Sequence, residues 1–202
     1  MATTKTDPKS AAVSERDVKK AGKTYEGLSR EQLVEAYRYI MQLRHEPAVL
    51  VLSRQPLPTL DRKKYAPASG VARGAYVLAD ASRGNPEVIF IASGSEVSLA
   101  VEAHEKLIAE GIRSRVVSMP SWDIFEHQTQ EYRDEVLPPQ VTARVAVEQA
   151  STFGWERYIG RSGRMIGMKT FGASAPLKEL QRKFGFEPNR VVTAAKELLG
   201  RN

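Results

Sequence analysis

The chain has 202 residues, 42% of them hydrophobic and 27% charged, a balance typical of a globular protein large enough for one core domain. The net charge of +6 comes from 30 cations and 24 anions, and no aromatic residues interleave with a basic stripe, which argues against nucleic-acid binding. The lack of cysteine excludes disulfides and thiolate chemistry, and wholly apolar runs of only about five residues argue against a membrane span, so we expect a cytoplasmic protein.

The N-terminal quarter divides into three parts. Residues 1–27 are small and polar and predict a disordered arm, with no apolar core that would mark a signal peptide. The stretch "LSREQLVEAYRYIMQLR" has apolar residues at helical spacing after a Ser29–Gln32 capping pattern, and Pro47 ends it. The run of β-forming residues at 48–53 predicts a strand that delivers Arg54 to its own end.

Proline then dominates the next segment. Four of the eleven prolines lie between residues 47 and 67, so 55–73 predicts an extended linker rather than a packed element. We therefore expect a domain boundary near residue 70, with 28–54 as a helix and strand on one side and 74–202 as the main domain on the other.

The sequence of the main domain, residues 74–202, predicts an α/β fold. Near-continuous apolar runs are typical of strands covered on both faces, and they alternate with helical stretches. The sequence therefore predicts a three-layer sandwich whose sheet has about five mostly parallel strands, with helices on both faces and one antiparallel strand allowed at an edge. The expected strands are 74–80, 87–93, 114–120, 143–149 and 164–171, and the expected helices are 96–110, 122–137, 152–159, 175–184 and 188–199.

Two places have the chemistry to bind an anion. The guanidinium of Arg54 can hold a phosphate with two hydrogen bonds, although an exposed arginine at a strand end is the commoner case. In "IASGSEVSLA" a strand leads into a helix, where Gly94 allows a tight turn, Ser95 is a candidate cap, and Glu96 suits the helix N-terminus. Gly94 and Ser95 form a candidate anion site, yet a single glycine is weak evidence beside an ordinary turn.

The remaining polar residues do not specify a reaction. His104 lies at helical spacing among apolar residues, so we expect its side chain to be packed against them. His127 lies in a polar stretch, so we expect it to be solvated, and His45 lies at the end of the first helix. Asp123 and Glu148 lie where carboxylates usually cap helices. Ser53 and Ser151 lack the context of a nucleophile, and no histidines have metal-ligand spacing.

Longer strings of the sequence resemble transketolase. The resemblance starts at "EAYRYIMQLRHEPAVLVLSRQPLPTLDR" and continues through "VIFIASGSEVSLAVEAHEKLIAEGIRSRVVSMPSWDIFEHQ" to "KFGFEPNRVVTAAKELLG", about residues 35–202. It covers the end of that family's pyrimidine-binding domain and its C-terminal domain. Residues 1–34 instead resemble the opening helix of an E1 α component of 2-oxo-acid dehydrogenases.

The resemblance implies a role for Arg54 and a limit on activity. The arginine of the family's "SRQ" stretch contacts the sugar phosphate, and that role falls on Arg54 here. Two-carbon ketol transfer uses thiamine diphosphate and Mg²⁺, but the family's "GDG" metal motif, activating glutamate and catalytic histidines precede the matched region. We therefore expect no cofactor, no metal and no catalytic residue in this chain, and no activity from it alone.

Three functions stay open at this point. The chain is the C-terminal part of a transketolase, a non-catalytic dimerisation or binding module, or a piece of a 2-oxo-acid dehydrogenase E1 component. The expected partner is a second copy or a complementing chain that binds thiamine diphosphate, and a sugar phosphate only in a complete enzyme. Because the sheet that would pair with 48–53 is not part of this sequence, we expect that segment to be disordered, exchanged with a partner or prone to aggregate.

Overall fold

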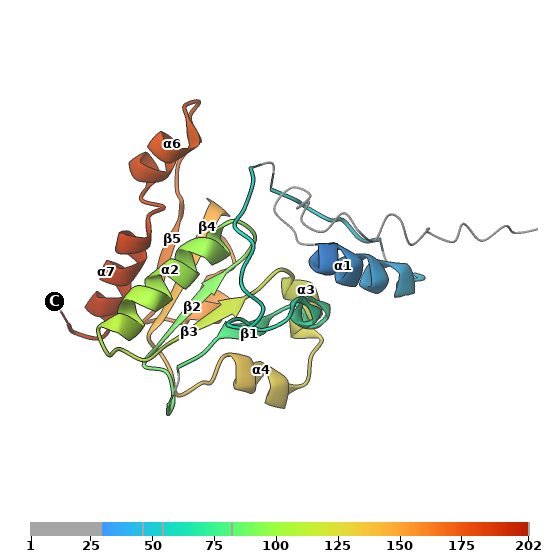
Figure 1. Cartoon of the computed structure of the whole chain (residues 1–202), viewed down its shortest axis with the longest axis horizontal. Coiled ribbons are helices and arrows are strands. Elements are labelled where there is room, and N and C mark those ends of the chain that lie inside the picture. Colours follow the sequence, from blue (N-terminus) through green and yellow to red (C-terminus); the bar gives the residue numbers. More distant parts are fainter. Residues whose placement is uncertain (1–29, 46, 54, 82, 202) are drawn as a thin grey trace, which may run out of the picture.

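A five-stranded sheet forms the centre of the structure, a computed structural model that describes residues 30–45, 47–53, 55–81 and 83–201 (Figure 1). The strand order is β1-β3-β2-β4-β5, with β1 antiparallel at one edge and the other strands parallel. The predicted mostly parallel α/β sandwich is therefore confirmed. The strands are β1 Tyr76–Ala79, β2 Val88–Ala92, β3 Ser114–Ser118, β4 Arg144–Ser151 and β5 Arg164–Met168.

Helices cover both faces of this sheet. Helices α2 and α7 pack together over one face, whereas α3, α4 and α5 lie over the other (Figure 1). The helix α6 projects from the body and buries none of its residues. The helices are α1 Arg30–Gln42, the 3-10 helix η2 Ala68–Arg73, α2 Glu96–Ala109, α3 Trp122–Glu126, α4 Gln130–Val136, α5 Glu156–Ile159, α6 Leu177–Phe184 and α7 Pro188–Leu198.

The central strand β2 shows why the strands have continuous apolar sequences. All five of its residues are buried. Val88, Phe90 and Ala92 point into the layer beneath α2 and α7, while Ile89 and Ile91 point into the opposite layer with Phe125. Since successive side chains alternate between faces, a strand covered on both sides must be apolar at every position.

The single helix predicted over 122–137 is wrong in detail. The structure has two helices there, α3 and α4, separated by a short turn. The hydroxyl of Ser121 accepts from the backbone N–H of Ile124, and that of Thr129 accepts from the N–H of Tyr132, both at 3.3 Å. Each hydroxyl caps its own helix start, so Thr129 begins a new helix where the sequence suggested a continuous one.

The strand predicted over 48–53 is absent from the structure, in which residues 47–53 have no regular secondary structure. Val49 and Val51 are 86% and 88% exposed and Leu50 is 47% exposed, whereas Leu52 is partly buried. A strand needs a hydrogen-bonding neighbour, and none of the described strands lies beside this segment. The segment has the β propensity of a strand, but the pairing is missing.

The linker predicted over 55–73 is wrong for its second half, which packs against the domain. Tyr65 and Ala68 are buried, and the N–H of Ala66 donates to the carbonyl of Leu78 at 3.0 Å. The Tyr65 hydroxyl also donates to Glu105 on α2. These contacts offset the entropy cost of ordering the segment, and the domain boundary near residue 70 stays a prediction.

Some predictions concern residues that the structure does not describe. The predicted disordered arm of 1–27 and the capping serine Ser29 lie outside the described residues. None of the helices in the described ranges combines the length and the apolar composition that a membrane span requires.

Candidate functional site

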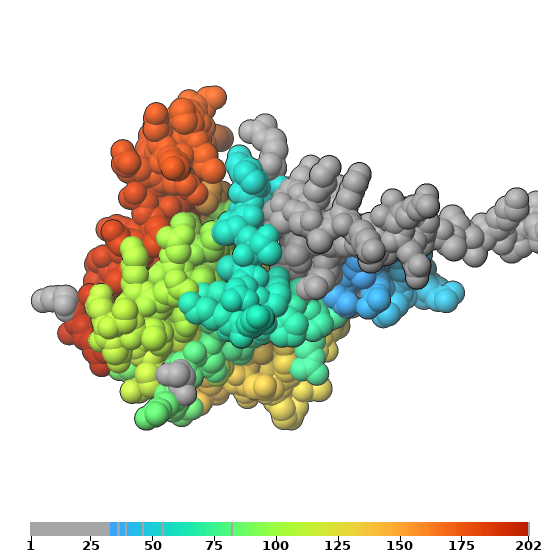
Figure 2. Space-filling view, in the orientation of Figure 1, coloured from blue at the N-terminus to red at the C-terminus, as the bar shows by residue number. Residues whose placement is uncertain are grey.

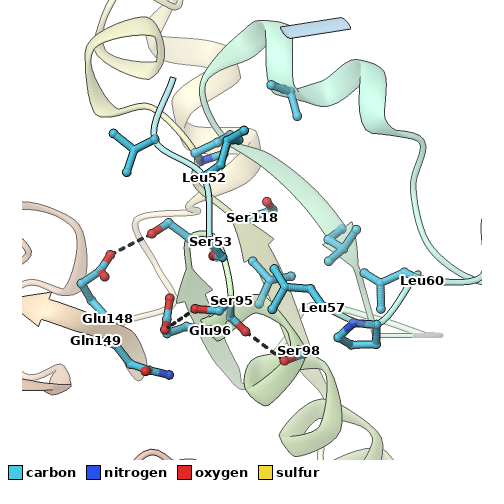
Figure 3. A pocket seen from close by; sticks show the side chains of 18 of the residues that line it. Leu52, Ser53, Leu57, Leu60, Ser95, Glu96, Ser98, Ser118, Glu148 and Gln149 are labelled. Atoms are coloured by element: carbon cyan, nitrogen blue, oxygen red, sulfur yellow. Dashed lines mark hydrogen bonds between the residues drawn. The ribbon is translucent and has the colours of Figure 1, made fainter. Parts of the chain in front are cut away.

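The carboxyl ends of β2, β3 and β4 open into a pocket of about 510 Å³ (Figure 3). In open α/β sheets, ligands bind at this edge of the sheet. The chain segment that precedes the domain covers the pocket and supplies its apolar side. The polar wall consists of Ser93, Ser95, Glu96, Ser98, Ser118, Glu148 and Gln149, and the apolar cover includes Leu50, Leu52, Leu57, Leu60 and Val71.

The turn from β2 into α2 forms part of the polar wall. Gly94 has a φ of 51°, in the left-handed region that favours glycine, so it permits the tight turn predicted from the sequence. The N–H of Glu96 donates to the carbonyl of Ser93 at 3.1 Å and closes the turn. The turn therefore presents the side chains of two serines and Glu96 at the end of the strand.

Ser95 does not act as the predicted helix cap. Its φ and ψ of −65° and −29° are already helical, and its hydroxyl accepts no hydrogen bond from the first helical turn. Instead, Ser95 Oγ donates to Oε1 of Glu96 at 2.8 Å, as drawn in Figure 3. A cap needs a non-helical backbone so that the hydroxyl can face back onto the helix, and Ser95 lacks that conformation.

Glu96 is the most unusual residue of the pocket, because this glutamate is only 3% exposed. Burial disfavours the charged form and raises the pKa of Glu96 from its ordinary value of 4.5 to about 7, although the Ser95 hydroxyl and the N–H of Glu96 itself act in the opposite direction. The carboxyl group is therefore poised between its neutral and charged forms near neutral pH.

A second carboxylate shares the pocket with Glu96. Glu148, near the end of β4, accepts a hydrogen bond from Ser93 Oγ at 2.7 Å. Its negative charge is a further cause of the raised pKa of Glu96. Glu148 was predicted to cap a helix, but the structure shows that it links the ends of two neighbouring strands instead.

Arg62, from the covering segment, also lines the pocket. Its Nη1 donates to the carbonyl of Ala66 at 2.9 Å, and its buried Nε has no hydrogen-bond partner among the described residues. The pocket therefore has acceptors at the strand ends and a guanidinium on the side of the covering segment.

Of the two anion sites predicted from the sequence, only the turn at Gly94 and Ser95 lies within the described residues. Arg54 itself lies outside the described residues, but the adjacent Ser53 lines the pocket, with Oγ 3.8 Å from where a Cβ on Gly94 would lie. Figure 2 shows the teal stretch of the covering segment lying against the yellow-green helix α2. The structure thus brings the stretch preceding Arg54 to the turn that holds Gly94 and Ser95.

The other candidates from the sequence lie apart from this pocket. His104 is buried, as predicted, with Nδ1 2.8 Å from Ser114 Oγ, and burial lowers its pKa. His127 is exposed, as predicted, beside an exposed Asp123. His45 is also exposed. Within the described part of the chain, no three metal-ligating side chains lie together.

Sequence reasoning missed Glu96 as a functional candidate. A glutamate that follows a serine at a helix start is typical of an exposed first turn, and nothing in "SGSEV" indicates burial. The pocket that Glu96 lines also contains Leu57 and Leu60, which are far away in the sequence. A local pattern could not have identified it.

Comparison with known proteins gives a consistent result. The family model for the transketolase-like TK C-terminal domain matches residues 74–187. The chain is 48% identical over 166 residues to a transketolase of Geobacillus stearothermophilus, and the match covers 82% of this chain and 25% of that protein. It is 52% identical over 164 residues to transketolase 1 of Escherichia coli, and that match covers 81% of this chain and 24% of the relative.

Solved structures give the same answer. A transketolase from Leishmania mexicana superimposes with a TM-score of 0.74 at 38% identity, over 87% of this chain and 25% of that one. A Pichia stipitis transketolase in complex with sedoheptulose 7-phosphate superimposes with a TM-score of 0.75 at 34% sequence identity. This match covers 88% of this chain and 26% of that one. The chain therefore spans about a quarter of the length of the relatives it matches.

Proposed function

The chain belongs to the transketolase-like C-terminal domain family, and from this premise we propose that it serves as the C-terminal part of a thiamine-diphosphate-dependent transketolase. That enzyme would transfer a two-carbon ketol unit between sugar phosphates. The observation that carries this proposal is the identity of 48–52% to transketolases over four fifths of the chain. The string "SMPSWDIFEHQ" lies within the stretch on which the transketolase resemblance rests and favours it over an E1 component.

The proposed reaction needs groups from outside the described residues. Thiamine diphosphate would act as the electron sink of the transfer, held through Mg²⁺ by its diphosphate. By the family resemblance, the metal motif, the activating glutamate and the catalytic histidines precede the region that this chain matches. We therefore assign no step of the reaction to this domain, and a cytoplasmic location for the complete enzyme stays a prediction.

A partner is also part of the proposal. Phe171 is 98% exposed and Phe153 is 85% exposed, and both lie close to the strand ends of β4 and β5. Large exposed apolar side chains, together with the exposed valines of 47–53, favour a surface that is covered in an assembly. We propose that a second copy or a complementing chain with the cofactor domains covers this surface.

Complementation tests the proposal directly. The purified chain is assayed with xylulose 5-phosphate, ribose 5-phosphate, thiamine diphosphate and Mg²⁺, alone and mixed with a relative truncated before its C-terminal domain. We expect no turnover from either chain and turnover from the mixture. Turnover by this chain alone, surviving repurification, would show that it holds a cofactor site and would refute the proposed division of labour.

The role of Arg54 needs a separate experiment, and it remains a proposal that rests on the family resemblance. In a relative whose C-terminal quarter is replaced by residues 35–202 of this chain, Arg54→Ala should raise KM for sugar phosphates and leave KM for glycolaldehyde, which has no phosphate, unchanged. Arg38→Ala is the matched control, because that side chain is 68% exposed on α1. Equal effects on both acceptors would mean that Arg54 does not bind phosphate.

A further inference from the structure

We propose that the outer edge of β5 pairs with β5 of a second copy of this chain, so that two five-stranded sheets join into one. Among the described strands, β4 is the sole neighbour of β5, so the sheet ends there. This dimer is one form of the partner in the proposed function and in part rests on that proposal. It is measured by self-association and not by turnover, so a failed transketolase assay leaves it untouched.

The backbone of β5 is open on the side that faces away from β4. A strand at the edge of a sheet directs about half of its N–H and C=O groups away from its neighbour. Among the described residues, no backbone hydrogen bond outside the ladder with β4 involves Arg164–Met168. Helix α7 packs against β4 as well as β5, so it covers a face of the sheet and not this edge. The edge therefore presents the unpaired donors and acceptors to which a further strand can bind.

The other edge of the sheet is protected, whereas β5 is not. At β1, the N–H of Ala66 donates to the carbonyl of Leu78 at 3.0 Å, so the preceding segment occupies that edge. Residues 165–168 of β5 are Met-Ile-Gly-Met and contain no lysine or proline, two residue types that protect exposed edges in native proteins. The sequence of β5 therefore leaves its edge free to pair.

A second copy fits this edge by symmetry. A two-fold axis at Ile166 makes the two β5 strands antiparallel and brings Arg164 of each copy opposite the uncharged Met168 of the other. Opposing residues then differ by an even number, so outward-facing backbone groups meet outward-facing ones. Lys169 lies about 10 Å from this axis, which separates the two lysines by about 20 Å, well beyond the Debye length at physiological salt. The charges of the strand are therefore compatible with the pairing.

Exposed phenylalanines beside the edge supply apolar area. Phe171, just after β5, is 98% exposed, and Phe153, just after β4, is 85% exposed. Figure 1 shows the orange chain after β5 leaving the body of the domain toward α6. Burial of an aromatic side chain removes about 150–250 Å² from water, so the four phenylalanines of a dimer contribute about 600–1,000 Å². With the paired edges, this approaches about 1,200 Å², the lower end of specific interfaces.

Sedimentation velocity on the full 202-residue chain measures the self-association. We expect a monomer–dimer equilibrium with a dissociation constant below about 100 µM, as for a small interface. Phe171→Asp should weaken it at least about hundredfold, because each dimer loses two buried aromatic side chains and gains two charges. Val51→Asp is the matched control, since this side chain is 88% exposed in the segment before the domain. A chain that stays monomeric, an equal loss in both variants, or a loss only in Val51→Asp would overturn the proposal.

Hydrogen exchange tests the strand pairing itself. The outward-facing amides of 164–168 should exchange about twofold or more slowly at about 200 µM than at about 2 µM, because pairing gives them hydrogen bonds. Phe171→Asp should show fast exchange at both concentrations, and the amides of β2 should not depend on concentration in either chain. Circular dichroism verifies that the variant is folded. A dimer without this protection, or a chain that binds a truncated relative through Phe171 and not a second copy, would show that β5 does not pair with itself.

Discussion

Glu96→Gln should change how the stability of this domain depends on pH. Burial raises the pKa of Glu96 to about 7 in the folded protein, compared with its ordinary value of 4.5. The folded state therefore holds the proton more tightly than the unfolded state does. The stabilisation that this proton contributes is complete below about pH 4.5 and is lost as the pH rises through about 7.

The structure sets the size of the effect. Each pH unit between the two pKa values corresponds to about 1.4 kcal/mol, so the interval from 4.5 to 7 gives about 3 kcal/mol. Glutamine cannot ionise, so the variant does not experience this loss. Relative to the native chain, Glu96→Gln should gain about 3 kcal/mol in the free energy of unfolding between about pH 4 and pH 9.

Urea unfolding at a series of pH values measures this difference. Tryptophan fluorescence is a suitable signal, because Trp155 is buried and Trp122 packs against it with ring centroids 5.1 Å apart. Glu102→Gln, at an exposed position of the same helix, is the matched control. A constant difference for Glu96→Gln as well would refute the reasoning, because it would mean that the folded carboxyl group titrates as it does in the unfolded chain.

Further substitutions test the packing that supports the pocket, each by urea unfolding. Gly74→Ala should lower the free energy of unfolding by well over 2 kcal/mol, because the φ of Gly74 is 80° and the new Cβ would lie 2.3 Å from a backbone nitrogen of α3. Gly111→Ala is the control, since Gly111 has a similar φ but open space around it, and it should lower the free energy of unfolding by only about 1 kcal/mol. Phe90→Ala should cost about 3–5 kcal/mol in the core, whereas Phe153→Ala at the surface should change the unfolding free energy by less than about 0.5 kcal/mol. Arg144→Met should cost at least about 2 kcal/mol, because that guanidinium donates to four backbone carbonyls.

The sheet could be predicted from the sequence because its signal is local. Each strand of a sheet covered on both faces must be apolar along its whole length, and β2 has that property over Val88–Ala92. Gly94 also has a local requirement, since its turn needs a positive φ. All five expected strand segments therefore contain the observed strands, apart from the last two residues of β4.

The segment before the domain could not be predicted in the same way. A run such as "AVLVL" has the propensity of a strand, but whether it becomes one depends on a neighbouring strand. The proline-rich stretch reads as a linker, yet Tyr65 and Ala68 are buried against the domain. In both cases the outcome depends on contacts with residues that are distant in the sequence.

The residues of the pocket were even harder to predict from the sequence than the segment before the domain. Glu96 opens a helix with an ordinary sequence, and its unusual pKa follows from burial rather than from its neighbours in the chain. Glu148 comes from a strand more than fifty residues away, and Ser93 joins it across the sheet. Leu57 and Leu60 belong to a segment that the sequence assigned to a linker. The chemistry of the pocket therefore exists only in the folded chain, and the segment before residue 70 has to be counted as part of the site it covers.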